Sequence, residues 1–160
     1  MRTIDITGYG TRGSVSMGER KIRDTLEGQQ LVTAQSTMNV AQVAAMMKED
    51  SIGAILVLNG DKLVGIFTER DALFRVVAEG LDAEKTTIAE VMTENPVTIG
   101  PDKFFTDALE IMYGGRHRHV PVVENGGPIG MVSSRDAMGP ELEQFVYSKI
   151  LQEQTFDVLA

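Results

Sequence analysis

An internal repeat is the feature that most limits how this chain can fold. Residues 32–72 align with residues 97–137 without a gap, at a constant offset of 65 positions. Near the end of each copy the chain reads GIFTERDALF and GMVSSRDAMG, and Gly65 falls on Gly130 in the same register. Self-similarity at a fixed offset is typical of a duplicated supersecondary unit, so the chain is predicted to contain two copies of one structural unit.

The first copy has the sequence pattern strand, helix, strand, strand, helix. Asn39 is the expected N-cap of its first helix, whose apolar positions from Val40 to Met47 have helical spacing. The runs IGAILVL and LVGIF, joined by NGDK, predict a β-hairpin, because Asn-Gly favours the tight turns between antiparallel strands. The segment TERDALFRVVAEG then predicts a second helix, with Leu73 and Val77 among the residues on its apolar side.

The second copy repeats this pattern with different residues. Phe104 and Ala108 begin the apolar face of its first helix, and HVPVV and PIGMV, joined by ENGG, form its expected hairpin. A short helix is also expected before each copy, in KIRDTLEG and in TTIAEVMTEN. The predicted fold class is therefore mixed α/β (α+β), with two tandem βαββα repeats, a short helix before each, and a C-terminal helix.

These elements divide the chain into four expected segments. They are a flexible N-terminal arm over residues 1–20, one repeat over residues 21–85, the other over residues 86–150, and a C-terminal tail over residues 151–160. No Pro- or Ser-rich linker separates the repeats, so we expect them to pack as one body.

Charge and composition exclude several classes of partner. The chain of 160 residues has a net charge of −8, which repels nucleic acids and anionic membranes as bulk partners. No segment approaches the length of about 20 apolar residues that a membrane span needs. With no cysteine, the chain has neither disulfides nor thiolate metal ligands. We therefore expect a cytoplasmic protein that binds neither nucleic acid nor membrane.

The duplicated hydroxyl and acid of Thr68-x-x-Asp71 and Ser133-x-x-Asp136 allow two interpretations. One is a capping box, in which the hydroxyl caps a helix and the acid reaches back to the cap residue. The other is a nucleotide site: the helix start attracts a phosphate oxygen, and the carboxylate accepts hydrogen bonds from a ribose diol. One side chain can serve both purposes, and both interpretations stay open from the residues alone.

The two motifs together resemble the cystathionine-β-synthase-type (CBS) domain, in the tandem pair known as a Bateman module. The similarity covers about residues 21–150 and is carried by GIFTERD and GMVSSRD, with VMTENPVTIGPD and RHRHVPVV as supporting matches. It implies two α/β repeats related by pseudo-twofold symmetry, with two potential clefts for adenosine-containing ligands. Such modules commonly form homodimers and regulate an attached or partner protein, and no catalytic chemistry comes with the fold.

The same resemblance implies which residues bind the ligand. Asp71 and Asp136 would hold ribose hydroxyls, Thr68 and Ser133 would face phosphate or ribose, and the motif arginines would lie beside them. The side chains that would line the ligand are therefore Thr68, Arg70 and Asp71, their echoes Ser133, Arg135 and Asp136, and the adenine walls Val32, Thr33, Ala54, Ile55, Val97, Thr98, His119 and Val120.

The sequence RHRH before the strand HVPVV is the single basic cluster of the chain. It is either an exposed loop or a source of positive charge for a phosphate, with Arg116, Arg118 and His119 as possible contacts. As a metal site it lacks a third identifiable ligand. As a nucleic-acid patch it is too short and has no interleaved aromatic residues.

The second repeat departs from the first beyond its motif. Gly139 and Pro140 interrupt the helix that should follow Asp136, so the second cleft is expected to have a different shape. Further on, Leu142 to Ile150 carry apolar residues near helical spacing, which favours internal packing or a dimer contact over a cofactor site.

These observations predict a stand-alone regulatory module that binds AMP, ADP, ATP, an NAD-type nucleotide or S-adenosylmethionine in clefts between the two repeats and signals to an unknown effector protein. The alternative is a ligand-independent module for assembly or dimerisation through protein–protein contacts. No P-loop, nucleophile elbow or metalloprotease motif is present, which argues against an enzyme and against a catalytic cofactor.

Overall fold

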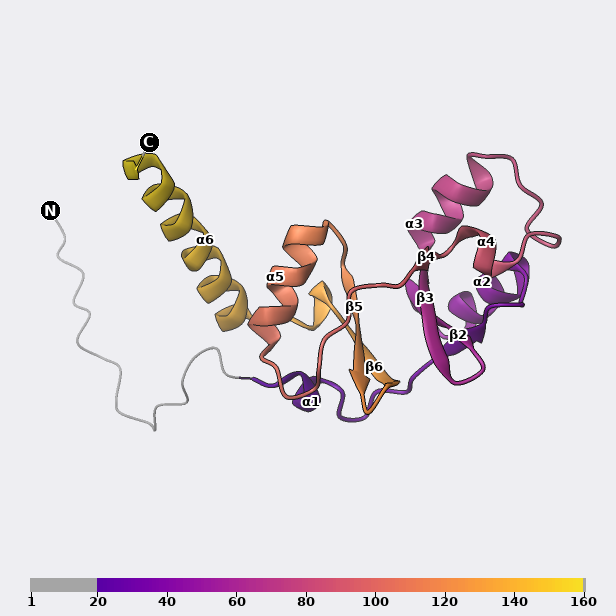
Figure 1. Cartoon of the computed structure of the whole chain (residues 1–160), viewed down its shortest axis with the longest axis horizontal. Helices are drawn as coiled ribbons and strands as arrows, with labels where there is room; N and C mark the ends of the chain where they lie inside the picture. Colours follow the sequence, from indigo (N-terminus) through magenta and orange to yellow (C-terminus); the bar gives the residue numbers. More distant parts are fainter. Residues whose placement is uncertain (1–19, 160) are drawn as a thin grey trace, which may run out of the picture.

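The computed structural model describes residues 20–159, with side chains through residue 152, so the expected N-terminal arm lies outside the described residues except for Arg20. Figure 1 shows the two repeats next to each other and α6 extending from one end. The first repeat contains β1 (Thr33–Gln35), α2 (Val40–Glu49), β2 (Ala54–Asn59), β3 (Lys62–Thr68), α3 (Glu69–Asp71) and the π-helix η1 (Ala72–Val77). The second contains α5 (Phe105–Gly115), β5 (His119–Glu124), β6 (Gly127–Ser133), the 3-10 helix η2 (Ser134–Asp136) and α6 (Gly139–Leu159). Three short elements precede or join them: α1 (Ile22–Thr25), α4 (Ile88–Val91) and β4 (Thr93–Glu94).

The sheets confirm the mixed α/β fold with two repeats. In the first repeat β1 pairs in parallel with β2, β2 is antiparallel to β3, and β4 adds to the other edge of β3. In the second repeat β5 and β6 form the hairpin, and the strand equivalent to β1 is reduced to one parallel bridge between Ile99 and Val122. That bridge is equivalent to the Ala34–Val57 pair of the first repeat, because both of its residues lie 65 positions further along the chain.

The two hairpins share the same irregularity in strand register. The register of β2 against β3 shifts between Val57 and Leu58, and that of β5 against β6 shifts between Val122 and Val123. Each hairpin closes through a turn of two residues, with positive φ at its glycine as such turns require. The gapless alignment of the sequence therefore corresponds to equivalent positions in space.

Each short helix packs against the other repeat and not against the one that follows it: α1 packs against the second repeat and α4 against the first. The N–H of Ile22 in α1 donates to the carbonyl oxygen of Lys103 at 2.9 Å, and Ile22 is fully buried in the core of the second repeat. In the same way, the N–H of Ile88 in α4 donates to the carbonyl oxygen of Met38 at 2.8 Å, within the first repeat. In Figure 1, α1 accordingly lies beneath β5 and β6. The two repeats are thus interlocked, in keeping with pseudo-twofold symmetry.

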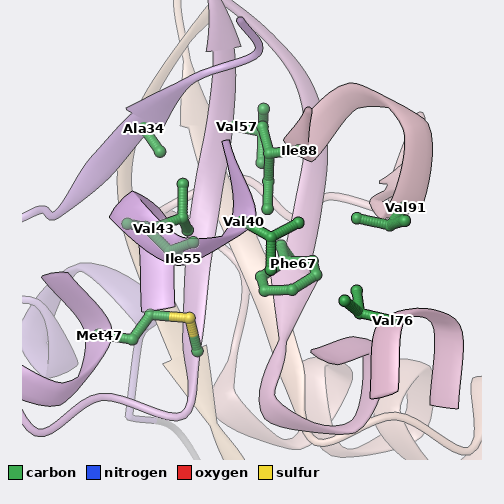
Figure 2. Close-up of a cluster of buried hydrophobic side chains, with 10 residues drawn as sticks. All are labelled: Ala34, Val40, Val43, Met47, Ile55, Val57, Phe67, Val76, Ile88 and Val91. Carbon is green, nitrogen blue, oxygen red and sulfur yellow. The ribbon is translucent and has the colours of Figure 1, made fainter. Parts of the chain in front are cut away.

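The described residues form three buried apolar clusters, of which the smallest contains Ala54, Leu56 and Ile66. Figure 2 shows the first, in which Ile88 and Val91 from α4 pack with Phe67 from β3 and Val76 from η1. The second core is built from Ile22, Ile99, Phe105, Ala108, Leu109, Met112, Val120, Val122 and Val132. Burial of these side chains is the main source of stability and holds the strand ends in place.

Two expectations for helix faces need correction. Leu73 and Val77 are exposed, and only Val76 on that stretch is buried, because the segment winds as a π-helix and its wider turn changes which side chains share a face. In the second repeat Phe104 is the N-cap of α5 and is partly exposed, so Phe105 takes the buried position.

The C-terminal helix α6 begins at Gly139 and continues to Leu159, past the expected tail boundary. Phe145 packs against the second core, with its ring 5.8 Å from that of Tyr113 in an edge-to-face arrangement. Leu142, Val146 and Ile150 are exposed. Within the described part of the chain, no helix has both the length and the apolar character to cross a membrane.

Candidate ligand-binding cleft

The first motif places a carboxylate at the junction of β3 and α3. Asp71 Oδ2 accepts hydrogen bonds from the backbone N–H of Thr68 at 2.9 Å and from its hydroxyl at 2.8 Å. The hydroxyl oxygen of Thr68 in turn accepts from the N–H of Asp71 at 3.2 Å, which confirms the predicted capping box. Oδ1 of Asp71 forms an ion pair with Arg75, at 3.4 Å from its Nε.

A cavity of about 550 Å³ opens beside this carboxylate and is walled by both repeats. The first repeat supplies the motif residues, and the second supplies the RHRH segment and the chain that leads into Val97. The lining residues are Ile66, Thr68, Arg70, Asp71, Arg75, Thr93, Asn95, Pro96, Val97, Gly115, Arg116, His117, Arg118 and His119. A volume of this size is typical of sites for small molecules.

Positive charge dominates the cavity. Four arginines line it, and Asp71 is its single carboxylate. Arg75 donates to the carbonyl oxygens of Val91 and Met92 at 3.1 and 2.7 Å, at the C-terminal end of α4. Arg118 forms an ion pair with Glu69 across the two repeats at 3.0 Å. The cavity is therefore suited to an anion even though the chain as a whole is acidic.

His119 contributes a neutral ring to the cavity wall. Burial lowers its pKa below the ordinary value for histidine, and the neighbouring positive charge of Arg118 lowers the pKa further. At neutral pH the imidazole can therefore donate or accept a hydrogen bond without adding charge.

The second motif forms the same local structure in different surroundings. Asp136 accepts a hydrogen bond from the N–H of Ser133 at 2.6 Å, as Asp71 does from Thr68. The chain then becomes extended at Ala137, and α6 starts afresh at Gly139, so no equivalent of η1 follows. The nearest cavity, of about 370 Å³, includes Arg135 but neither Ser133 nor Asp136. The chain after the second motif therefore differs from the chain after the first, and the shape of a second cleft stays a prediction.

Apart from Arg135, which lines the second cavity, the predicted ligand-binding residues fall into three groups. The first cavity is lined by Thr68, Arg70, Asp71, Val97, Arg116, Arg118 and His119. The proposed adenine walls Ala54, Ile55 and Val120 are fully buried among core side chains. Neither cavity includes Val32, Thr33, Thr98, Ser133 or Asp136, and Val32 packs against the first core.

Several lining residues were not predicted. Arg75 follows Asp71 by four positions, a spacing at which an acid and a base meet on one helix face, so this pair was readable from the sequence. Thr93, Asn95 and Pro96 reach the cavity because β4 pairs with β3, which only the tertiary fold shows. Within residues 20–159, no group of three or more His, Asp or Glu side chains could hold a metal ion.

Comparison with known proteins gives a consistent result. A family model described as CBS domain matches the chain twice, over residues 25–78 and 88–139. A CBS domain-containing protein of Arabidopsis thaliana is 36% identical over 119 residues, which cover 74% of this chain and 22% of that protein. A protein of Methanopyrus kandleri is 30% identical over 142 residues, which cover 88% of this chain and 68% of that protein. This chain thus spans about a fifth of the plant relative and about two thirds of the archaeal one.

Among solved structures, a CBS domain protein of Pyrobaculum aerophilum in complex with AMP has a TM-score of 0.71 to this chain at 25% sequence identity. The match covers 79% of this chain and 98% of that one.

Proposed function

Because the chain belongs to the CBS-domain family and carries two tandem copies of that domain, we propose that it is a regulatory module that binds an adenosine-containing ligand and signals its occupancy to a partner protein. The observation that carries the proposal is the cavity that joins Thr68 and Asp71 of one repeat to the RHRH segment of the other. The AMP complex of the P. aerophilum protein supports the class of ligand. The candidates are AMP, ADP, ATP, an NAD-type nucleotide and S-adenosylmethionine.

The geometry favours one orientation of the ligand. Oδ1 of Asp71 accepts a ribose hydroxyl, because Oδ2 is already engaged by Thr68. Arg116 and Arg118 line the same cavity from the second repeat and attract the phosphate. Ile66 and Val97 offer apolar surface to the base.

The ligand acts by connecting the two repeats. Its ribose is held by the first repeat and its phosphate by the second, so occupancy stabilises one relative arrangement of the two. A ligand shifts such an equilibrium only by the difference between its affinities for the two arrangements. We propose that a homodimer of the module transmits this shift to an effector protein in the cytoplasm.

The decisive test compares the two motif aspartates by isothermal titration with AMP and ATP. Asp71→Ala removes a charged acceptor from the cavity and is expected to weaken binding by about tenfold or more, since a hydrogen bond to a charged group contributes about 1.5–3 kcal/mol. Asp136→Ala removes the equivalent capping interaction from the second motif. Because Asp136 lines neither cavity, we expect this variant to bind as the wild type does.

Thermal unfolding of both variants serves as the control. Both lose a capping carboxylate, which is expected to cost about 1 kcal/mol, and Asp71→Ala should lose more because Asp71 also accepts from the Thr68 hydroxyl and pairs with Arg75. Equal loss of nucleotide affinity in both variants would instead mean that each repeat has its own site. Unchanged affinity in Asp71→Ala would contradict the proposal.

Assembly without a ligand is the second candidate function. Leu73, Phe74 and Val77 on η1 and Val146 and Tyr147 on α6 are all more than half exposed. Apolar side chains of this size at a surface are typical of protein–protein contacts. A module that dimerises and binds its partner equally well with the cavity blocked by Asp71→Trp would favour assembly over ligand sensing.

A further inference from the structure

We infer that the cleft selects a nucleoside polyphosphate, such as ADP or ATP, over AMP and over S-adenosylmethionine. This inference rests on the proposed function and specifies the ligand class of the same cavity. It is carried by the number, the pairing and the backbone conformation of the arginines that line the cleft.

The charge of the cleft is opposite to that of the chain. Arg70 and Arg75 come from the first repeat, Arg116 and Arg118 come from the second, and Asp71 is the only carboxylate among the lining residues. The whole chain carries a net charge of −8, so a polyanion is attracted here only by local charge. Charges within one partly enclosed cavity are screened less than charges on an open surface. A cationic sulfonium ligand would be repelled by the same arginines.

Most of this positive charge is available to a ligand. Among the side chains that the structure describes, residues 20–152, no ion pair or hydrogen bond engages Arg70 or Arg116. Arg118 has Glu69 as its partner, but both side chains are 59% exposed, and an exposed ion pair contributes about 1 kcal/mol or less. Exchanging that pair for a phosphate therefore costs little. Three available guanidinium groups exceed the charge of one phosphate and match that of two or three.

The backbone of Arg116 is an independent observation that points to its side chain. This residue ends α5 in the left-handed conformation, with φ of 54°, where glycine or asparagine is usual. A non-glycine residue costs about 1 kcal/mol or more in this region. Ser51, the equivalent residue of the first repeat, has the same φ of 54°. The fold therefore imposes this backbone conformation on both residue types. An arginine here is costly for folding and is explained by what its side chain binds.

The test is isothermal titration of the full chain with adenosine, AMP, ADP, ATP, inorganic tripolyphosphate and S-adenosylmethionine, without divalent cations. We expect affinity to rise about fivefold or more with each phosphate added to adenosine, because each adds hydrogen bonds between charged groups and an arginine. S-adenosylmethionine is expected to bind more weakly than AMP. The advantage of ATP over AMP should shrink as salt is raised from about 0.05 to 0.5 M, since screening weakens charge interactions.

Arg116→Gly separates the role of this residue in binding from its role in folding. It removes one cation and relieves the left-handed backbone, so we expect ATP to bind about tenfold more weakly while the melting temperature stays equal or rises. Adenosine, which has no phosphate, should bind as before. Lys62→Gln is the matched control, because it removes one positive charge from an exposed position outside the cleft. We expect it to leave all affinities unchanged.

The outcomes distinguish this inference from the proposed function. AMP binding as tightly as ATP, or S-adenosylmethionine binding more tightly than AMP, would overturn the polyphosphate preference and leave an adenosine sensor standing. Tripolyphosphate binding as tightly as ATP, with both unaffected by Asp71→Ala, would keep the anion preference and overturn adenosine recognition. If none of the six compounds bound, both the polyphosphate preference and the proposed function would be overturned.

Discussion

At the scale of single residues, the same chemical group serves different purposes in the two repeats. Asp71 and Asp136 both accept a hydrogen bond from the backbone N–H three positions before them. Of these two acids, Asp71 lines one of the two cavities described above and Asp136 lines neither, and the other carboxylate oxygen of Asp71 forms an ion pair with Arg75. The same capping interaction therefore has different surroundings in the two repeats.

His119 gives a prediction on pH at this scale. Its pKa is lowered in the folded state by burial and by Arg118, so below about pH 6.5 the unfolded chain binds more protons than the folded one. The free energy of unfolding should therefore fall as the pH is lowered from about 7 to 5. His119→Gln removes this titration, and urea unfolding across the same pH range should show a shallower decline. Equal slopes in both proteins would mean that burial of His119 does not oppose its protonation.

At the scale of elements, the repeated glycines explain how the short helices fit against the hairpins. A Cβ atom at Gly65 in β3 would lie 2.3 Å from Sδ of Met92, directly after α4. A Cβ atom at Gly130 in β6 would lie 2.6 Å from Cδ2 of Leu26, at the end of α1. Glycine is needed at both positions because a short helix or the residue after it passes close to the strand. In each case this segment precedes the other repeat in the sequence.

Substitution of either glycine should loosen this contact. Gly65→Ala and Gly130→Ala force the crossing side chain to shift, and overpacking of this kind costs about 1–3 kcal/mol. Urea unfolding monitored by circular dichroism measures the loss. Gly127→Ala is the matched control in β6, because a Cβ atom there meets no neighbour within 4 Å. A loss in the control as large as in the other two variants would assign the effect to backbone propensity in place of packing.

At the scale of the whole molecule, the chain segment before α1 is tied to the C-terminal helix. Arg20 donates to both carboxylate oxygens of Glu141 at 2.8 and 2.9 Å and to the backbone carbonyl oxygen of Asp136 at 2.6 Å. Its guanidinium also lies 4.8 Å from the centre of the Phe105 ring. Glu141 is 4% exposed, so this pair connects distant parts of the chain within the protein interior.

Loss of that connection should be costly. Arg20→Ala leaves Glu141 buried without its partner, and we expect a loss of about 3 kcal/mol in the free energy of unfolding. Arg23→Ala is the matched comparison, because Arg23 pairs with Glu124 at 2.7 Å and both side chains are much more exposed. That variant should lose about 1 kcal/mol or less. Urea unfolding measures the free energy of unfolding of both variants. Similar losses would show that removing Arg20 does not leave Glu141 as a buried, unpaired charge.

The amino-acid sequence by itself determined the repeat, the hairpins, the caps and the family. The two hairpins have equivalent bulges at Val57 and Val122, which lie 65 residues apart as the repeat predicts. Asn39 caps α2 as predicted, and its side chain accepts a hydrogen bond from the N–H of Gln42 at 2.9 Å. These features depend on residues close together in the chain, or on a period that needs no knowledge of packing. They can therefore be predicted from local patterns.

Only the tertiary structure decided which residues form the cleft. The family resemblance suggested two clefts, the second of a different shape, but it did not show that the cavity beside Asp71 is also lined by Arg116 and His119 of the other repeat. Predicted walls such as Ile55 and Val120 are instead buried in the cores. The physical reason is that each short helix packs on the repeat that it does not directly precede, and that α6 restarts after Asp136. Both arrangements depend on contacts between segments far apart in the chain, which local periodicity does not encode.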